Sequence, residues 1–318
     1  MMLIINENLN KQLSIWSKKY TVFAPVKRND DYIYDQIFDF KNFSVTNNLT
    51  VIPLKKFLIP SKEILFKFEN NKITKPKKIE KKSIVIVPNA QDMDAIKILD
   101  QIFLLDTYYQ FRRKNIIFLG IGIIEPKQYD VFLEKIDNEY IIHNNLNKLI
   151  FQNNLLNESK SNYIEPKTSF TDPLLADQKK LSNAIKLSVN DPIWERLTEI
   201  CLGCGICSYV CPLCYCSYNK DELDLSKINC NDCTKITSGT RNRKWDSCLL
   251  ANFSKVSQNH NFRPRLKDNI YNWYHHKFVR FPSEFNEVGC VNCGRCIKYC
   301  PAKINYKKVL QEILEKYN

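Results

Sequence analysis

Apolar positions in the first part of the chain alternate between helical and strand-like spacing. Leu9, Leu13 and Trp16 recur at helical spacing, which predicts an amphipathic helix at Asn6–Lys19, and a short β-rich run follows at 20–26. Further along, the pattern predicts a hairpin at 63–74, a buried strand at Ser83–Val87, a helix from 91 to about 103 and a buried strand at 115–124. This succession is typical of a mixed α/β domain, which we place at 1–165.

A polar stretch separates this domain from the remainder of the chain. Residues 158–172 are polar and interrupted by Pro166, with Pro173 directly after them, so they form the expected linker. Helical patterns at 174–187 and 192–200 follow the linker. The second domain is therefore placed at 173–318.

All thirteen cysteines lie in this second part, between Cys201 and Cys300. Residues 1–10 are rich in amides and lack a basic stretch ahead of a long apolar region, so we expect no secretory signal and a cytoplasmic location. Because the cytoplasm keeps thiols reduced, the cysteines predict metal ligands and not disulfides. The longest apolar run, 116–124, is far shorter than the roughly 20 residues that span a bilayer, so no membrane partner is expected.

Eight of these cysteines form two runs with the spacing C-x2-C-x2-C-x3-C, each followed by proline. The runs are Cys201, Cys204, Cys207 and Cys211, then Cys290, Cys293, Cys296 and Cys300. Three cysteines spaced in this way can surround one [4Fe–4S] cluster, and in two-cluster ferredoxins the fourth cysteine ligates the other cluster. We therefore assign Cys201, Cys204, Cys207 and Cys300 to one cluster, and Cys290, Cys293, Cys296 and Cys211 to the second.

The runs define the class of the second domain. The predicted fold is α+β, in which the mixed α/β domain without cysteines precedes a helical, ferredoxin-like domain that holds two [4Fe–4S] clusters. The stretch between the runs, at about 217–285, is an insertion into that domain.

Five cysteines lie outside the ligand assignment. They are Cys214, Cys216, Cys230, Cys233 and Cys248. Cys230 and Cys233 form a zinc-like hook, and with the others they are candidates for an extra site that holds zinc or a third cluster. The alternative is that these thiols are reduced and pack around the clusters.

Glycine is scarce, and its placement bears on the cofactors. Only seven glycines occur, and Gly203, Gly205 and Gly294 in the cysteine runs allow backbone amide groups to point at cluster sulfurs. No phosphate-binding glycine loop remains, so a flavin or nicotinamide is expected on a partner, and no catalytic site is expected on this chain.

The net charge of +13 raises the question of nucleic acid. The positive residues are mostly lysines scattered along the chain, which does not favour nucleic-acid binding. Four-thiolate clusters are negatively charged, and we expect part of the basic excess to offset them.

Motifs around the ligands resemble the A-type iron–sulfur subunit of anaerobic sulfite reductase and the beta subunit of soluble nickel–iron hydrogenases, also called sulfhydrogenases. The segments that carry this resemblance are Trp194, 211–216 (CPLCYC), 243–248 (RKWDSC), 261–263, 276–278 and 289–296, together with 19–25 and 106–113 in the first domain. Residues His276 and Lys277 among them are expected to close the cluster pocket or to contact a partner.

The resemblance implies an iron–sulfur electron-transfer subunit of a cytoplasmic, anaerobic oxidoreductase complex. Electrons would pass from a flavin subunit that oxidises NAD(P)H to a siroheme sulfite reductase subunit. Two alternatives stay open: the beta subunit of a soluble nickel–iron hydrogenase, and a free-standing two-domain ferredoxin. Relatives of this kind carry further cysteines in the first domain, one of them before an Asp, whereas here Gln91 precedes Asp92. The first domain is therefore expected to hold no cluster.

Overall fold

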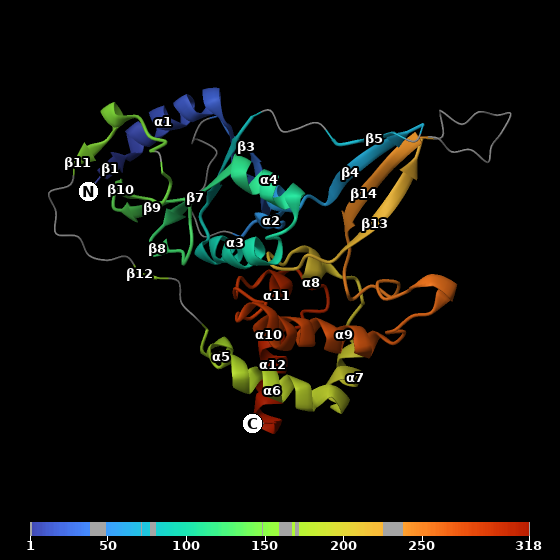
Figure 1. The fold of residues 1–318 in the computed structure, drawn as a ribbon. Coiled ribbons are helices and arrows are strands. Elements are labelled where there is room, and N and C mark those ends of the chain that lie inside the picture. Colours follow the sequence, from blue (N-terminus) through green and yellow to red (C-terminus); the bar gives the residue numbers. More distant parts are fainter. Residues whose placement is uncertain are drawn as a thin grey trace.

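A computed structural model describes residues 2–38, 49–70, 72–76, 81–147, 149–158, 167–168, 172–224 and 238–317 (Figure 1). Elements of the first domain occupy the upper part of the view, and the helices that carry the cysteine runs lie below them. The chain ends in the lower part, beside α6.

The larger sheet has the strand order β11-β1-β10-β9-β7-β6-β2-β3. Its central strands β2, β6, β7 and β9 are parallel, and the strands at both edges add antiparallel pairings. The strands span Met2–Ile5 (β1), Thr21–Arg28 (β2), Asp31–Gln36 (β3), Ser83–Val87 (β6), Ile116–Gly122 (β7), Val131–Ile136 (β9), Glu139–Asn144 (β10) and Asn157–Glu158 (β11). The mixed α/β character predicted for this part is confirmed.

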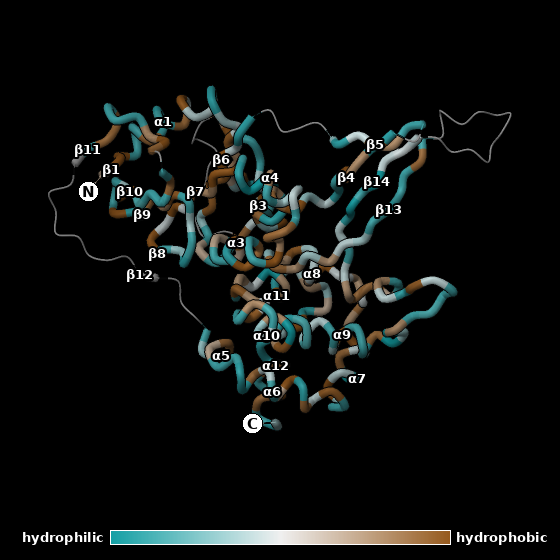
Figure 2. The backbone as a smooth tube through the Cα atoms, viewed as in Figure 1, coloured by the Kyte–Doolittle hydropathy of each residue, from teal (hydrophilic) through white to brown (hydrophobic). Residues whose placement is uncertain are grey.

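Helices cover both faces of this sheet. Side chains alternate along a strand, so Ile84 and Ile86 of β6 pack on the face of α1 (Asn6–Lys19), whereas Val85 and Val87 pack on the opposite face. That opposite face holds α3 (Ala90–Ile102) and α4 (Thr107–Asn115). Because both faces of β6 are buried, the strand is apolar throughout, and it is brown in Figure 2.

A second sheet joins segments that are far apart in the sequence. Its order is β13-β14-β4-β5, and all its pairings are antiparallel. The predicted hairpin is confirmed as β4 (Lys62–Glu69) and β5 (Lys72–Thr74), and β14 (Ser238–Trp245) and β13 (Ser217–Leu223) extend it. The second pair belongs to the stretch expected to be an insertion, so this stretch contacts the first domain. The short strands β8 (Ile124–Glu125) and β12 (Lys167–Thr168) pair in parallel.

The lower part is built of short helices around an apolar core that includes Trp194, Trp273 and Leu310. Its helices are α5 (Pro173–Ala176), α6 (Gln178–Leu187), α7 (Ile193–Thr198), α8 (Ile206–Tyr209), α9 (Leu266–His275), a π-helix (His276–Arg280), α10 (Phe281–Phe285), α11 (Arg295–Lys298) and α12 (Tyr306–Lys316), with 3₁₀ turns at Ser188–Asn190 and Ser257–Asn259. The first domain also contains the short helix α2 (Lys55–Leu58) and a 3₁₀ turn at Asn153–Leu155. The single helix expected at 174–187 is two helices, because Asp177 caps α6 by accepting from the amide of Lys180.

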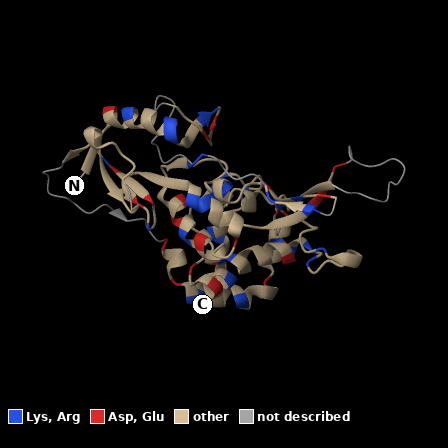
Figure 3. Cartoon of the chain, turned by 45° about the horizontal axis from the view of Figure 1, so that its top comes forward, with Lys and Arg blue, Asp and Glu red and all other residues tan. Residues whose placement is uncertain are grey.

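Charged residues are interspersed along the chain. Figure 3 shows Lys and Arg beside Asp and Glu on several helices of both parts. Within the described ranges, no helix is both long and apolar enough to cross a membrane. The expected linker falls mostly outside the described residues, so the domain boundaries stay predictions.

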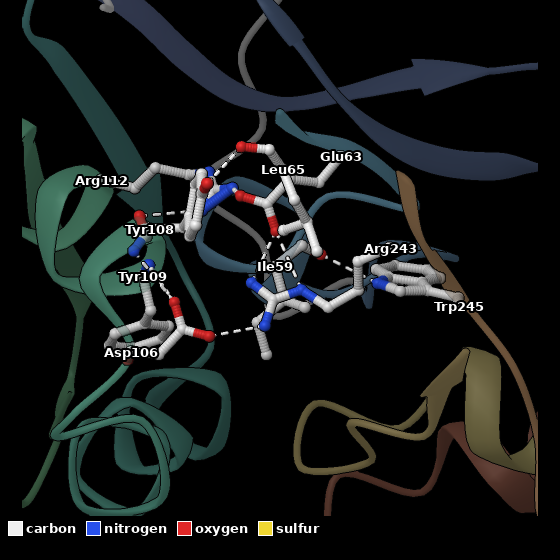
Figure 4. Close-up of polar contacts among 9 residues, drawn as sticks. All are labelled: Ile59, Glu63, Leu65, Asp106, Tyr108, Tyr109, Arg112, Arg243 and Trp245. Carbon is white, nitrogen blue, oxygen red and sulfur yellow. Dashed lines mark hydrogen bonds and ion pairs between the residues drawn. The ribbon is translucent and has the colours of Figure 1, made fainter. Parts of the chain in front are cut away.

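Ion pairs that are largely shielded from solvent connect β14 to β4 and to the start of α4 (Figure 4). Arg243 on β14 donates from Nη2 to Glu63 Oε2 at 2.5 Å, and from Nη1 to Asp106 Oδ2 at 2.5 Å. Asp106 also caps α4, because its Oδ1 accepts from the amides of Tyr108 and Tyr109 at 2.9 Å. One arginine from the later half of the chain thus connects a strand and a helix of the first domain.

Replacing Arg243 by Met should lower the free energy of unfolding by about 2 kcal/mol, because Glu63 and Asp106 would both lose hydrogen bonds from this cation, while Glu63 would keep its ion pair with Arg112. Arg241→Met is the matched control on the same strand, since Arg241 pairs with Asp221 in solvent and should leave stability nearly unchanged. Thermal and denaturant unfolding measure both variants. If the two variants lost equal stability, the ion pairs of Arg243 would contribute no more than the exposed pair of Arg241, which would contradict this prediction.

Candidate iron–sulfur site

The eight cysteines of the two runs line two adjacent cavities. The cavity that we call outer is lined by Cys201, Cys204, Cys207 and Cys300. The inner cavity is lined by Cys211, Cys290, Cys293 and Cys296. Each set contains three cysteines of one run and the fourth of the other, the grouping that the crossed assignment predicts. Cys296, Trp273 and Tyr306 line both cavities and form their shared wall.

The two runs adopt the same backbone geometry. Gly205 and Gly294 precede the short helices α8 and α11 with φ of 74° and 78°, and the earlier positions Gly203 and Asn292 have φ of 61° and 56°. This left-handed conformation favours glycine and, next to it, asparagine. The helices α8 and α11 contact each other, which brings the runs side by side (Figure 1).

Backbone amides donate to cysteine sulfurs at the cavities. The donors are the amides of Leu213 to Cys211, Asn292 to Cys290, and Ile304 to Cys300, each at 3.4 Å. Such donors stabilise a thiolate and, in an iron–sulfur cluster, raise its reduction potential. These donors are not the amides next to Gly203, Gly205 or Gly294, so the expected role of the glycines stays a prediction.

The cavity walls are largely apolar, with Leu197, Leu249 and Ile270 around the outer one. Burial raises the pKa of the Cys207 thiol to about 12 and also raises the pKa values of Cys293 and Cys296. Thiolates are unfavourable in such surroundings unless a positive metal stabilises them. Cysteines that line two adjacent cavities fit [4Fe–4S] clusters, because the iron of a cluster would displace the thiol protons.

Lys277 lies against the inner cavity. It is 4% exposed, and its Nζ donates to Cys211 Sγ at 3.2 Å and to the carbonyl of Gly289 at 2.9 Å. Burial opposes its charge, yet Cys211, Cys214 and Cys290 raise the pKa of Lys277 well above its usual value. The sequence motifs suggested that Lys277 closes the cluster pocket or contacts a partner, but they did not predict its contact with the sulfur of Cys211.

Comparison with known proteins agrees with this geometry. Residues 200–304 match the family described as the 4Fe-4S dicluster domain. The chain carries a C-terminal 4Fe–4S domain. It is also 29% identical over 323 residues to the beta subunit of sulfhydrogenase 2 from Pyrococcus furiosus, an alignment that covers 92% of each chain. The resemblance to a sulfhydrogenase beta subunit inferred from the motifs is confirmed, and the resemblance to sulfite reductase stays a prediction. No solved structure matches the chain.

Arg295 couples the 4Fe–4S domain to the first domain. Its side chain is fully buried, forms a two-pronged ion pair with Asp92 on α3 and donates from Nε to the carbonyl of Thr50 at 2.6 Å. The residue lies between the inner-cavity cysteines Cys293 and Cys296 in the sequence. The motif contained the arginine, but no sequence pattern indicated this contact.

Lys55 approaches the 4Fe–4S domain from the first domain. It is 2% exposed, and its Nζ donates to the carbonyls of Ser208 and Cys214 at 3.0 and 2.8 Å and lies 4.5 Å from the centre of the Trp245 ring. About 150 residues separate Lys55 from these partners, so no local sequence pattern indicates it.

The five remaining cysteines divide into three groups. Cys214 forms a hydrogen bond with Cys211, which lowers the pKa of Cys211 well below its usual range together with Lys277. Cys216 and Cys248 form a second hydrogen-bonded pair. Cys230 and Cys233 lie outside the described residues. Within the described part, no three His, Cys, Asp or Glu side chains converge as a single metal ion requires, and an extra site stays a prediction.

The equivalent glycines of the two runs offer a matched test of the loops. Gly294→Ala should cost about 1–2 kcal/mol of stability through its left-handed backbone, since nothing lies within 4 Å of the new Cβ. Gly205→Ala should cost more and should lower iron content, because its Cβ would lie 2.6 Å from Ser247 Cβ. Unfolding curves and iron assays compare the two variants. A larger loss for Gly294→Ala would contradict this description of the loops.

Proposed function

We propose that the protein is the iron–sulfur electron-transfer subunit of a hydrogenase-type complex. The observation that carries the proposal is the pair of adjacent cavities with a shared wall, each lined by the four cysteines of one predicted cluster. Clusters in such cavities would be close enough to exchange electrons. The chain's own residues would hold the clusters, exclude water and supply amide and lysine hydrogen bonds to the sulfurs.

The crossed ligand set belongs to this proposal. Cys300 lines the outer cavity with the first run, and Cys211 lines the inner cavity with the second run. This arrangement supports two [4Fe–4S] clusters in a ferredoxin-like packing of the runs. Among the remaining cysteines, Cys214, Cys216 and Cys248 then act as thiols that pack beside the ligands.

Hydrogenase is preferred over sulfite reductase as the parent complex. The sequence motifs placed sulfite reductase first, but the relative that covers most of the chain is a sulfhydrogenase subunit. The partners we propose are a flavin subunit that oxidises or reduces NAD(P)H and a nickel–iron catalytic subunit. The proposal fits a cytoplasmic, anaerobic setting, because the ligand thiols must stay reduced.

Cofactor content tests the proposal first. The chain purified alone without oxygen should contain about eight iron and eight acid-labile sulfide, the content of two four-iron clusters. About twelve iron would indicate a third cluster. Zinc without the visible absorption of iron–sulfur charge transfer would overturn the assignment.

The same measurement on the native complex distinguishes the parent enzymes. A tagged chain isolated from its own cells should carry nickel and flavin in near-stoichiometric amounts. Siroheme in place of nickel would instead identify a sulfite reductase complex, and a chain without partners would be a free-standing ferredoxin.

Cys211→Ser tests the crossed ligation. It should alter the EPR spectrum of the inner cluster and leave the outer one nearly native, because Cys211 lines the inner cavity although it belongs to the first run. Cys300→Ser is the reciprocal variant and should alter the outer cluster alone. If Cys211→Ser altered only the cluster at Cys201, Cys204 and Cys207, ligation would be local and the crossed assignment would be wrong.

A further inference from the structure

The two cavities differ in the charge of their walls. Among the described residues, no charged side chain lines the outer cavity, whereas the ammonium group of Lys277 lines the inner one. Its Nζ lies 3.2 Å from Cys211 Sγ and 5.1 Å from the centre of the Trp273 ring, in the wall that the cavities share. The distinction between the cavities is therefore electrostatic as well as geometric.

The position of Lys277 is fixed from two sides. Its carbonyl accepts from the amide of Gly289 at 2.7 Å, and its Nζ donates to the carbonyl of the same glycine at 2.9 Å. A Cβ at Gly289 would lie 3.0 Å from Lys277 Cα, so a larger residue would push the two backbones apart. Because Gly289 directly precedes Cys290, the lysine is fixed to the start of the second run.

The burial of this ammonium group requires an anion. Transferring a charge from water into the protein interior costs several kcal/mol unless an opposite charge offsets it. In the described chain, the nearest polar groups of Lys277 are a carbonyl and a cysteine sulfur, and no carboxylate pairs with it. The thiolates of the inner cavity and the cluster that they would hold supply the opposite charge.

We propose that Lys277 raises the reduction potential of the inner cluster relative to the outer one. This inference rests on the proposed function, since it requires clusters in both cavities. Reduction adds negative charge to a cluster, and a buried cation stabilises the reduced state more than the oxidised state. The contact with Cys211 concentrates this effect on the inner cluster, so Lys277 is a positioning and tuning residue and not a catalytic one.

Two substitutions separate charge from hydrogen bonding. Lys277→Gln removes the charge and keeps a donor, and Lys277→Met removes both. In EPR-monitored redox titrations, both variants should shift the midpoint potential of the inner cluster to more negative values, and that of the outer cluster by less. Cys293→Ser assigns the inner signal, because Cys293 lines only the inner cavity.

Other lysines provide the controls. Lys55→Gln should give a smaller negative shift, since the Lys55 ammonium contacts carbonyls and no sulfur. Lys11→Gln should give none, because Lys11 is exposed and pairs with Glu7 on α1. An unchanged inner potential in Lys277→Gln with full iron content would overturn the inference, and so would equal shifts of both clusters.

A measurement on the unaltered protein covers the case in which the variants fail to assemble. With ¹⁵N-labelled lysine, pulsed EPR of the reduced inner cluster should show a weak ¹⁵N hyperfine coupling that the outer cluster lacks. Its absence would exclude the contact with Cys211 and overturn the inference. Failure of the proposed function is distinct, because it would appear in the unaltered protein as missing clusters, or as a native complex without nickel, and not as a change in the potential of one cluster.

Discussion

The buried ion pair between Arg295 and Asp92 holds the two halves of the molecule together at the inner cavity. The guanidinium lies beside the second cysteine run, and the carboxylate lies at the start of α3 in the first domain. Both side chains are almost fully buried, so each depends on the other to offset the loss of water. Loss of either partner would leave a buried charge at the boundary and disturb the cavity along with the fold.

Because of this ion pair, the first domain helps to hold the cysteine runs in place. Its face with α3 shares one apolar core with Cys211, Leu213 and Phe281 of the 4Fe–4S domain, and Lys55 donates to carbonyls of the first run. Cys211 of the inner cavity therefore packs at the boundary between the two halves, where Lys55 and Arg295 are buried. A ferredoxin module alone would lack Asp92 and Lys55 and would need other means to shield the cavity.

Local patterns predicted the elements better than their arrangement. The helix at Asn6–Lys19, the hairpin at 63–74 and the strand β6 agree with the structure, because their apolar periodicity is set within a few residues. The pairing of β14 with β4 depends on segments about 180 residues apart, as the contact of Arg243 with Glu63 shows. The apolar periodicity within a strand does not indicate which distant strand pairs with it.

The same contrast between local and long-range features applies to the candidate iron–sulfur site. Cysteine spacing predicted that each run brings its first three cysteines together, since these lie within seven residues of chain, and the crossed assignment of the fourth stays a prediction. The contacts of Lys277, Lys55 and Arg295 could not be predicted in this way, because each depends on a buried environment assembled from distant segments. These residues are charged and the fold buries them, so the sequence alone would place them in solvent.

Exposure gives the two cavities different roles in a relay. Cys204 of the outer cavity is exposed, and Leu202 beside it is 69% exposed, whereas Cys211 of the inner cavity is buried in a core that it shares with the first domain. On the proposed function, a partner's redox centre would approach the outer cluster most closely, since a short apolar loop lies over it. The inner cluster, next to Lys277, would then retain an electron more readily than it releases it. The fold would thus separate the cluster that meets a partner from the cluster that stores charge.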